Sequence, residues 1–283
     1  MGILYVVATP IGNLSDISER ALNVLREVDI ILCEDTRHSL KLLNHYDIKN
    51  NLISYHKFNE KERSNSIIEK LEGGKNIALI SDAGTPCISD PGYILVKDAK
   101  DKGIEVIGVG GISALITGLS VSGLNSDSFS FYGFFPRENK DKSDIIDNIK
   151  NSDIKTFIFY ESPKRIIKSL EYIFENLGNV LVSVSSDLTK LHEKNYYGRL
   201  DKVINELKNN DNSNLGEYTF IIENDLDFSN NDTTLSIEAM IVDEMISNNI
   251  SMKEAIDLVN NKNKDLHKKD IYNASLNLKN ILK

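Results

Sequence analysis

Short apolar runs alternate with amphipathic helical patterns along the first 121 residues of this 283-residue chain. Each run is too short for a core helix, and continuous apolar sequence of this length is typical of strands that are buried on both faces. The regular alternation of strand and helix predicts one doubly wound parallel sheet. The predicted strands occupy 3–8, 29–33, 52–54, 76–80 and a run that ends at Val109.

The pattern restarts after the polar stretch at 122–128. Helical patterns are fewer in this second part, so we expect some strands to pair as hairpins and to form a mixed sheet. The chain is long enough for two packed domains. We therefore predict an N-terminal α/β domain at 1–121 and a second α/β domain at 122–226.

Residues 227–283 are predicted to form a linker and a small helical tail. The start of this segment is rich in Asn and Asp, a composition that is typical of flexible chain. Three short helical patterns follow, and Ser251 with Glu254 predicts a capping box at the second. The tail carries no catalytic constellation of its own.

The stretch SDAGTPCISDPG, 81–92, follows one of the predicted parallel strands and precedes a predicted helix. Ligands of open α/β sheets bind outside the carboxyl ends of the strands. Two glycines, two prolines and two aspartates make this loop stiff and leave backbone donors free, which suits a small polar ligand. The alternative is an ordinary turn in which Ser89 or Asp90 caps the helix.

A second cluster of charged residues follows the strand at 29–33. Glu34 and Asp35 stand at the carboxyl end of that strand, and Arg37 comes soon after. Such a cluster at a strand end indicates a site, although it is also compatible with ordinary acidic residues at the start of the next helix, which we expect Thr36 to cap. Ser15 or Asp16 is the expected cap of the first helix.

The charge and cysteine content of the chain argue against some classes of function. A net charge of −9 argues against broad binding to nucleic acid, which depends on neutralising phosphates, but it leaves room for a local basic cleft. The two cysteines, Cys33 and Cys87, form neither a disulfide framework nor a metal motif. The apolar N-terminus lacks the basic flank and cleavage site of a signal peptide, so a cytoplasmic location is expected.

The loops, taken together, carry a set of motifs. They are ATPIGN, CEDTRH, YHKFNE, SDAGTPCISDPG, VGGISA, FYESPKR and LTKLHE. In their order and spacing they resemble the S-adenosylmethionine-dependent methylases that include the tetrapyrrole methylases, and most closely the ribosomal RNA branch of that family. The resemblance covers essentially the whole chain. It departs from the family pattern at Cys87, at Gly110 and Ile112, where prolines are usual, and at Ser186, where arginine is common.

The resemblance implies S-adenosylmethionine as cofactor, a cleft between two α/β domains, a homodimer, and no metal. It further implies methylation of the ribose 2′-hydroxyl of a cytidine in the decoding region of 16S rRNA, within the small ribosomal subunit. Carried over by position, the residues that bind the methyl donor are Asp82, Ala83, Gly84, Thr85, Ser113, Ala114, Tyr160, Leu188 and Thr219.

Methyl transfer to a hydroxyl needs an aligned acceptor, and a general base assists it. Glu34, Asp35 and Lys190 are candidates for that base, as is His192, whereas arginines are better suited to gripping phosphates. His56 is either a substrate contact or a residue that holds its own loop. The predicted catalytic set is Glu34, Asp35, Arg37 and Lys190. The predicted substrate-binding set is Pro10, Asn13, His56, Arg165 and His192.

Two other functions remain open at this point. A methylase of a tetrapyrrole or another small macrocycle would share the fold, so the fold alone does not discriminate it. A non-catalytic module for ribosome assembly would bind the donor without turnover, or not bind it.

Overall fold

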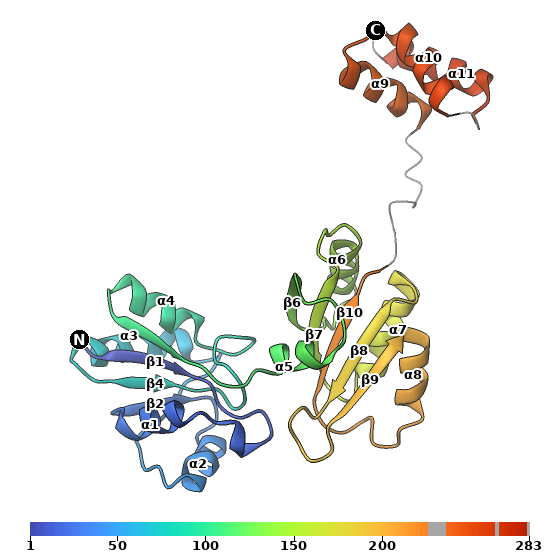
Figure 1. Cartoon of the computed structure of the whole chain (residues 1–283). Helices are drawn as coiled ribbons and strands as arrows, with labels where there is room; N and C mark the ends of the chain where they lie inside the picture. Colours follow the sequence, from blue (N-terminus) through green and yellow to red (C-terminus); the bar gives the residue numbers. More distant parts are fainter. Residues whose placement is uncertain (226–235, 264–265, 282–283) are drawn as a thin grey trace. The chain divides into compact units, whose positions relative to one another are not determined.

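The computed structural model describes residues 1–225, 236–263 and 266–281 (Figure 1). The chain divides into two compact units, 1–226 and 227–283, which are described separately below. The predicted linker at the start of the second unit lies outside the described residues. None of the described helices combines the length and the apolar character needed to cross a membrane.

The first unit begins with a five-stranded parallel sheet of order β3-β2-β4-β1-β5. This order confirms the predicted doubly wound sheet, because the chain moves outward in both directions from the centre. The strands are β1 (Ile3–Val7), β2 (Ile30–Cys33), β3 (Leu52–Ser54), β4 (Ile77–Leu79) and β5 (Glu105–Val109).

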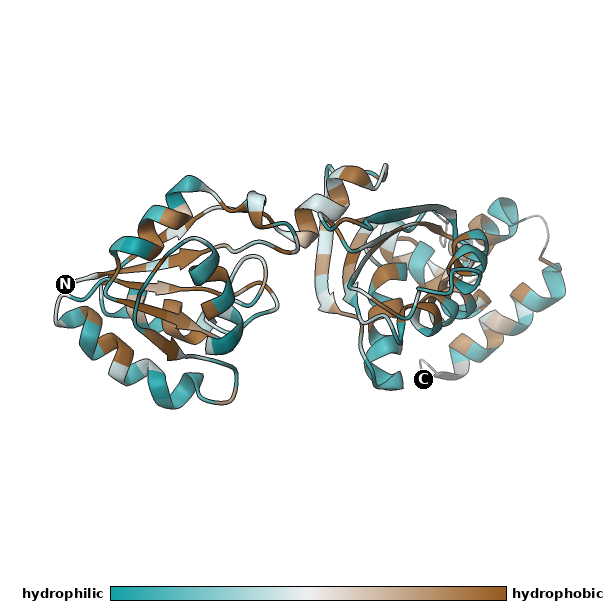
Figure 2. Ribbon diagram, turned by 90° about the horizontal axis from the view of Figure 1, so that it is seen from below, coloured by the Kyte–Doolittle hydropathy of each residue, from teal (hydrophilic) through white to brown (hydrophobic). Residues whose placement is uncertain are grey.

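Helices cover this sheet, and the strands between them are its most apolar part (Figure 2). In one buried cluster, Ile67 and Leu95 pack with Leu4 of β1. A second buried cluster contains Leu25 and Leu43. The helices are α1 (Glu19–Glu27), α2 (Thr36–His45), α3 (Glu60–Glu72), α4 (Tyr93–Asp101) and α5 (Ala114–Val121), with a short 3-10 helix, η1 (Leu14–Asp16).

The caps of α1 and α2 differ from the prediction. Ser18, and not Ser15 or Asp16, caps α1, because η1 occupies the earlier positions and Ser18 Oγ accepts from the Ala21 N–H. The cap of α2 is Asp35, which accepts a 2.8 Å hydrogen bond from the backbone N–H two residues later. Thr36 is already helical. A cap must stand directly before the first helical residue, and spacing alone misplaced both helix starts.

The second sheet has the order β6-β7-β10-β8-β9 and is mixed, as predicted. Strands β6 and β7 run parallel, the other neighbouring pairs are antiparallel, and β8 and β9 form a hairpin. The strands are β6 (Phe129–Phe134), β7 (Thr156–Glu161), β8 (Leu181–Ser186), β9 (Lys194–Arg199) and β10 (Tyr218–Glu223). The helices of this part are α6 (Asn139–Lys150), α7 (Ile166–Leu177) and α8 (Leu200–Lys208).

The second unit contains α9 (Ile237–Asn248), α10 (Met252–Lys262) and α11 (Lys268–Ile281). Its core is its own, formed around Ile241 and Val259. The capping box at the start of α10 is confirmed, since Ser251 and Glu254 exchange both hydrogen bonds. The exact boundaries of the three predicted domains stay a prediction.

Candidate functional site

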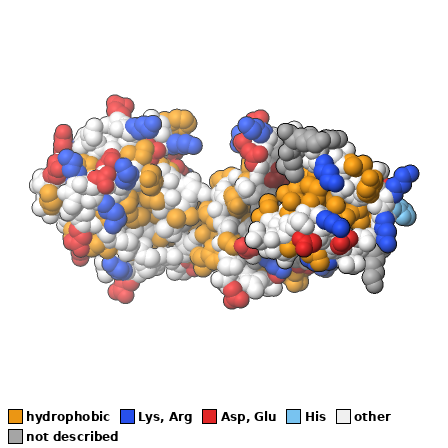
Figure 3. All heavy atoms as spheres, turned by 90° about the horizontal axis from the view of Figure 1, so that it is seen from above, with side chains coloured by type: hydrophobic (Ala, Val, Ile, Leu, Met, Phe, Trp, Pro, Cys, Tyr) orange, Lys and Arg blue, Asp and Glu red, His pale blue; other side chains and the backbone are white. Residues whose placement is uncertain are grey.

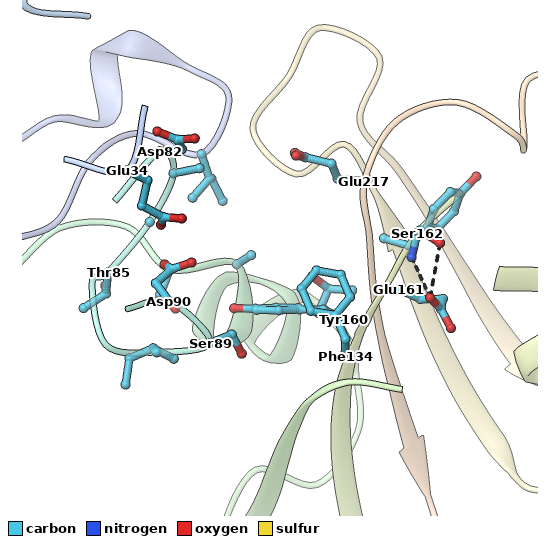
Figure 4. Close-up of a pocket in the computed structure, with 18 of the residues that line it drawn as sticks. Glu34, Asp82, Thr85, Ser89, Asp90, Phe134, Tyr160, Glu161, Ser162 and Glu217 are labelled. Atoms are coloured by element: carbon cyan, nitrogen blue, oxygen red, sulfur yellow. Dashed lines mark hydrogen bonds between the residues drawn. The ribbon is translucent and has the colours of Figure 1, made fainter. Parts of the chain in front are cut away.

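Loops from both sheets line a cavity of about 430 Å³, here called the first cavity (Figure 4). Its volume lies in the range of small-molecule sites. One wall comes from the loops after β2, β4 and β5, and the other comes from β7, β10 and the end of β6. The lining residues are Ile11, Glu34, Asp82, Ala83, Gly84, Thr85, Ile88, Ser89, Asp90, Ser113, Ala114, Phe134, Tyr160, Glu161, Ser162, Pro163, Glu217, Tyr218 and Thr219.

The loop after β4 is fixed by backbone contacts. Gly84 has a φ of +81° and exchanges two hydrogen bonds with Thr9, of 2.8 and 3.0 Å, at the end of β1. The residue that precedes α4 is Gly92, and not the predicted Ser89 or Asp90. Its φ is +133°, and a Cβ there would lie 2.7 Å from the sulfur of Cys87, so no other residue fits without displacement. The loop is therefore built to hold one shape.

Three carboxylates gather on one wall of the first cavity (Figure 4). Burial, together with the negative charges of Asp90 and Asp82, raises the pKa of Glu34 to about 7. Burial also raises the pKa of Asp90 to about 6, with a further contribution from Asp82 and an opposing hydrogen bond from Ser81. Like charges at a partly buried site disfavour full ionisation. Glu34 therefore exchanges its proton near neutral pH.

The opposite wall connects to α5 through two contacts. The backbone N–H of Leu115, in the first turn of α5, donates a 3.1 Å hydrogen bond to the Tyr160 hydroxyl. A Cβ added at Gly118 would lie 3.0 Å from the methyl of Thr219, so this glycine permits close packing of α5 on β10. The N-terminus of α5, with Ser113 and Ala114, is thereby held at the cavity.

Arg165 is engaged in a buried network and lines neither cavity described here. Glu161 is 2% exposed and accepts a hydrogen bond from the Ser169 hydroxyl at 2.6 Å, while Arg165 Nη2 lies 3.1 Å from its carboxylate. The same Nη2 donates to the carbonyls of Phe135 and Pro136, at 2.7 and 2.8 Å. Arg165 therefore fastens the turn after β6.

A second cavity, of about 550 Å³, adjoins the first. Lys190 lies at its edge, with Nζ 2.8 Å from Asp187 and 3.0 Å from Glu217. Burial opposes the charge of Lys190, but these hydrogen bonds outweigh it and raise the pKa of the ammonium group. The lining residues are Pro10, Ile11, Gly12, Leu14, His38, Lys41, Leu42, Asp82, Ala83, Lys190 and Glu217.

Most residues predicted to bind the methyl donor meet in the first cavity. Leu188 is the exception, because it is buried and packs near Gly118. Glu34 also lines the first cavity, whereas Pro10 and Lys190 line the second. The predicted donor-binding residues that line the first cavity are Asp82, Ala83, Gly84, Thr85, Ser113, Ala114, Tyr160 and Thr219.

Asp35 and Arg37 line neither cavity and pair with each other on the surface at 2.7 Å. Hydrogen bonds from the Arg37 side chain and backbone hold the pKa of Asp35 well below its usual range. Asn13 also stands apart, because its side chain caps η1 by accepting from the Ser15 N–H at 3.1 Å. Of the two adjacent carboxylates, Glu34 thus lines the first cavity, whereas Asp35 caps α2 and pairs with Arg37.

His56 and His192 line neither cavity. His56 Nε2 lies 3.2 Å from Asn59 Nδ2, and Asn59 Oδ1 accepts a hydrogen bond from the backbone N–H of His56. This contact favours the loop-holding role that the sequence left open for His56. His192 is exposed.

Sequence reasoning missed several lining residues. Asp90 belongs to the conspicuous 81–92 motif, and its position at a strand end could have revealed it. Glu217 precedes β10 without any motif, so for this residue the sequence carries no signal.

The first cavity suits S-adenosylmethionine, the donor that the resemblance implies. Its described lining includes five carboxylates and neither lysine nor arginine, which favours a ligand with cationic sulfonium and ammonium groups. Ile11, Ile88 and Phe134 supply apolar surface for a nucleoside. The glycines and small residues allow the ligand to approach the backbone.

Comparisons with known proteins identify the family of this chain. A model of the Tetrapyrrole (Corrin/Porphyrin) Methylases matches residues 3–204. Ribosomal RNA small subunit methyltransferase I of Haemophilus influenzae is 43% identical over 259 residues, covering 91% of each chain. The protein of the same name from Buchnera aphidicola is 40% identical and covers 96% of this chain and 95% of its own.

Among solved structures, diphthine synthase has the same fold, with a TM-score of 0.61 and 15% identity over 80% of this chain and 92% of its own. The match of the family model to most of the chain and the extensive identity to the curated relatives lead to one assignment. The chain belongs to the tetrapyrrole methylase family, in its small-subunit methyltransferase I group, and is an S-adenosylmethionine-dependent methyltransferase.

Proposed function

We propose that this protein methylates the ribose 2′-hydroxyl of a cytidine in the decoding region of 16S rRNA. The observation that carries the proposal is its 43% identity, over nine tenths of the chain, to a ribosomal RNA small subunit methyltransferase I. The site geometry supports it, because an acidic cavity that suits the donor adjoins a second cavity that has room for an acceptor.

The residues at the first cavity have distinct roles in the proposed reaction. Asp82, Gly84 and Ser113 hold the donor, which supplies an electrophilic methyl group when bound. Glu34 accepts the proton of the ribose hydroxyl as the oxygen becomes bonded to the methyl carbon and the carbon–sulfur bond breaks. A base with a pKa of about 7 is half ionised at neutral pH and is well matched to this task.

The other predicted bases suit this step less well. A lysine acts as a base only when its pKa is lowered, and the pKa of Lys190 is raised by its carboxylate partners. Asp35 is weakly basic because Arg37 stabilises its charge. Glu34 is therefore our choice as general base.

Transfer of a labelled methyl group to small subunits that lack the modification tests the proposal. We expect label on a ribose oxygen of one cytidine, located by nuclease mapping. Label on a base would contradict the assigned acceptor. Donor binding by calorimetry without any transfer would favour the macrocycle methylase or the non-catalytic module.

We further propose that the assembled subunit, and not free 16S rRNA, is the substrate. The net charge of −9 weakens non-specific attraction to RNA, and the face in Figure 3 carries both signs of charge intermixed. Turnover should be at least about tenfold faster on subunits than on free 16S rRNA. Equal rates on the two substrates would disprove this.

We propose a homodimer. Helix α5 exposes Ile116 and Val121, which are 54% and 48% exposed. Exposed apolar side chains on one helix are typical of an interface. Light scattering should give twice the chain mass of 31.8 kDa. A mass of one chain would contradict the proposal.

We also propose a cytoplasmic location. The two cysteines are free, with Cys33 buried, which fits a reducing compartment. Cell fractionation should find the protein with the ribosomal fraction and the cytosol. Recovery in the membrane fraction alone would contradict this location.

A further inference from the structure

We infer that the second cavity receives the target nucleotide, with its phosphate against His38 and Lys41 of α2. The inference rests on the proposed function and identifies which side chains recognise the acceptor. It assigns a function to a cavity and to two residues that do not belong to the donor site.

The cationic side chains lie on one side of the site. The described lining of the first cavity contains carboxylates and no lysine or arginine, whereas that of the second contains Lys41, Lys190 and His38 beside two carboxylates that it shares with the first, Asp82 and Glu217. A cationic donor is attracted to the first environment and a phosphate to the second. The reverse arrangement would place like charges together. The charges therefore assign one ligand to each cavity.

The two cavities meet along a shared wall, so their ligands can react. Asp82 and Ala83 line both cavities, and so do Ile11 and Glu217. A nucleotide in the second cavity with its ribose at this wall directs the hydroxyl toward the first cavity, which Glu34 also lines. Methyl transfer requires this adjacency of donor and acceptor.

The α2 end of the second cavity has free cationic groups. His38 and Lys41 are three positions apart, so they lie on the same face of the helix, and both are exposed. Among the described residues, neither takes part in an ion pair within 4.0 Å. Lys190 differs, because Asp187 and Glu217 already neutralise it. The phosphate therefore belongs at the α2 end.

The loop after β1 lines the second cavity and packs against Lys190. A Cβ at Gly12 would lie 2.5 Å from Lys190 Cγ, so this glycine allows the loop to pack against the lysine side chain. The loop and Lys190 thus close one end, and α2 forms the other. The 550 Å³ between them falls in the range of small-molecule sites.

The test compares Lys41→Gln with Lys49→Gln. Lys49 is exposed beyond the other end of α2 and lines neither cavity, so it is a matched control. Binding of small subunits is measured by co-sedimentation in the presence of S-adenosylhomocysteine, over a range of salt concentrations. Methyl transfer and donor affinity are measured in parallel.

We expect Lys41→Gln to weaken subunit binding and raise KM about tenfold, with kcat and donor affinity unchanged. The slope of log affinity against log salt should decrease by about one, as for the loss of one phosphate contact. Lys49→Gln should match the wild type. His38→Gln should weaken binding in the same direction, by a smaller factor.

Equal binding and equal salt slopes for Lys41→Gln and Lys49→Gln would overturn the inference. Failure of the wild type to bind subunits at all would also overturn it. If the wild type binds subunits but transfers no label, the proposed function fails, while a selective loss of binding in Lys41→Gln still supports the phosphate site. The two failures are therefore distinguishable.

Discussion

Glu34 and Asp35 are neighbouring carboxylates with opposite environments. Glu34 turns into the first cavity beside Asp82 and Asp90, where burial and like charge favour its protonated form. Asp35 caps α2 and pairs with Arg37 at the surface, which favours its ionised form. The chemistry at each position depends on what surrounds the side chain.

Glu34→Gln should lower kcat by about 10² to 10⁴, because the base is lost. In the wild type, kcat/KM should rise with pH up to about 7 and then level off, since the ionised form is active. The pKa of Asp90 is raised to about 6, close to that of Glu34, so the pH dependence of kcat/KM reflects the titration of both carboxylates together. An unchanged profile in Glu34→Gln would exclude Glu34 as the base. Glu105→Gln, at an exposed carboxylate, is the control.

The same substitution should affect stability with a predictable sign. The pKa of Glu34 is higher in the folded protein than its ordinary value of 4.5, so the folded state binds more protons between pH 4.5 and 7. The contribution of Glu34 to wild-type stability therefore decreases as pH rises through this range. The Tm of Glu34→Gln, relative to wild type, should increase from pH 5 to pH 8. A constant difference would show that the carboxylate is not perturbed.

Arg165→Met should reduce the free energy of unfolding by about 2 to 3 kcal/mol, because buried Glu161 loses its cationic partner. Lys164→Met, at the exposed neighbouring residue, should change it by less than about 0.5 kcal/mol. Urea denaturation measures both. If Arg165→Met instead kept full stability and lost subunit affinity, the phosphate-gripping role predicted from the sequence would be favoured.

Loops between elements shape the site, and their glycines mark close approaches. Gly84 pairs with Thr9 just after β1, Gly92 directly precedes α4, and Gly111 packs against Ala8. These contacts join the ends of adjacent strands into one wall. The family-typical prolines that are absent at Gly110 and Ile112 are thus not the only source of rigidity in the loop after β5.

Gly111→Ala and Gly110→Ala separate crowding from the general effect of replacing glycine. A Cβ at Gly111 would lie 2.9 Å from the Cβ of Ala8, whereas a Cβ at Gly110 meets nothing within 4 Å. Gly111→Ala should destabilise the protein by about 1 to 3 kcal/mol and weaken donor binding. Gly110→Ala should leave both nearly unchanged. Calorimetry with S-adenosylmethionine measures the affinities, and equal affinities would refute a role for this contact.

At the scale of the whole molecule, the two compact units have separate cores. Unit 1–226 holds both sheets and both cavities, and unit 227–283 packs its described helices around Ile241 and Val259. Domains with their own cores can unfold in separate transitions. The donor site should therefore be insensitive to the stability of the helical unit.

Ile241→Ala tests this independence. Ile241 is fully buried, so its truncation should destabilise the helical unit by about 2 to 5 kcal/mol. Ile246→Ala, at a residue that is 76% exposed on the same helix, should have little effect. Calorimetric scans should show one transition shifted, with donor affinity unchanged. Loss of donor affinity would mean that the units are energetically coupled.

The sequence by itself determined the order of elements and the loops that carry the site. Apolar runs between Gly-rich and Pro-rich turns predicted β1 to β5, and the capping box of Ser251 and Glu254 predicted the start of α10. The motif at 81–92 located most of one cavity wall. These features are local, because hydrophobic periodicity, turn chemistry and capping act between residues close in the chain.

Tertiary structure alone decided the roles of individual side chains. The proton affinity of Glu34 depends on Asp82 and Asp90, and the network of Arg165 depends on carbonyls at the end of β6. Glu217, just before β10 of the second sheet, lines the site without belonging to a motif. Burial, charge proximity and shared cavity walls arise only when distant segments of the chain pack together. The sequence pattern therefore could not distinguish the base Glu34 from the helix cap Asp35, or show that Arg165 holds a turn in place.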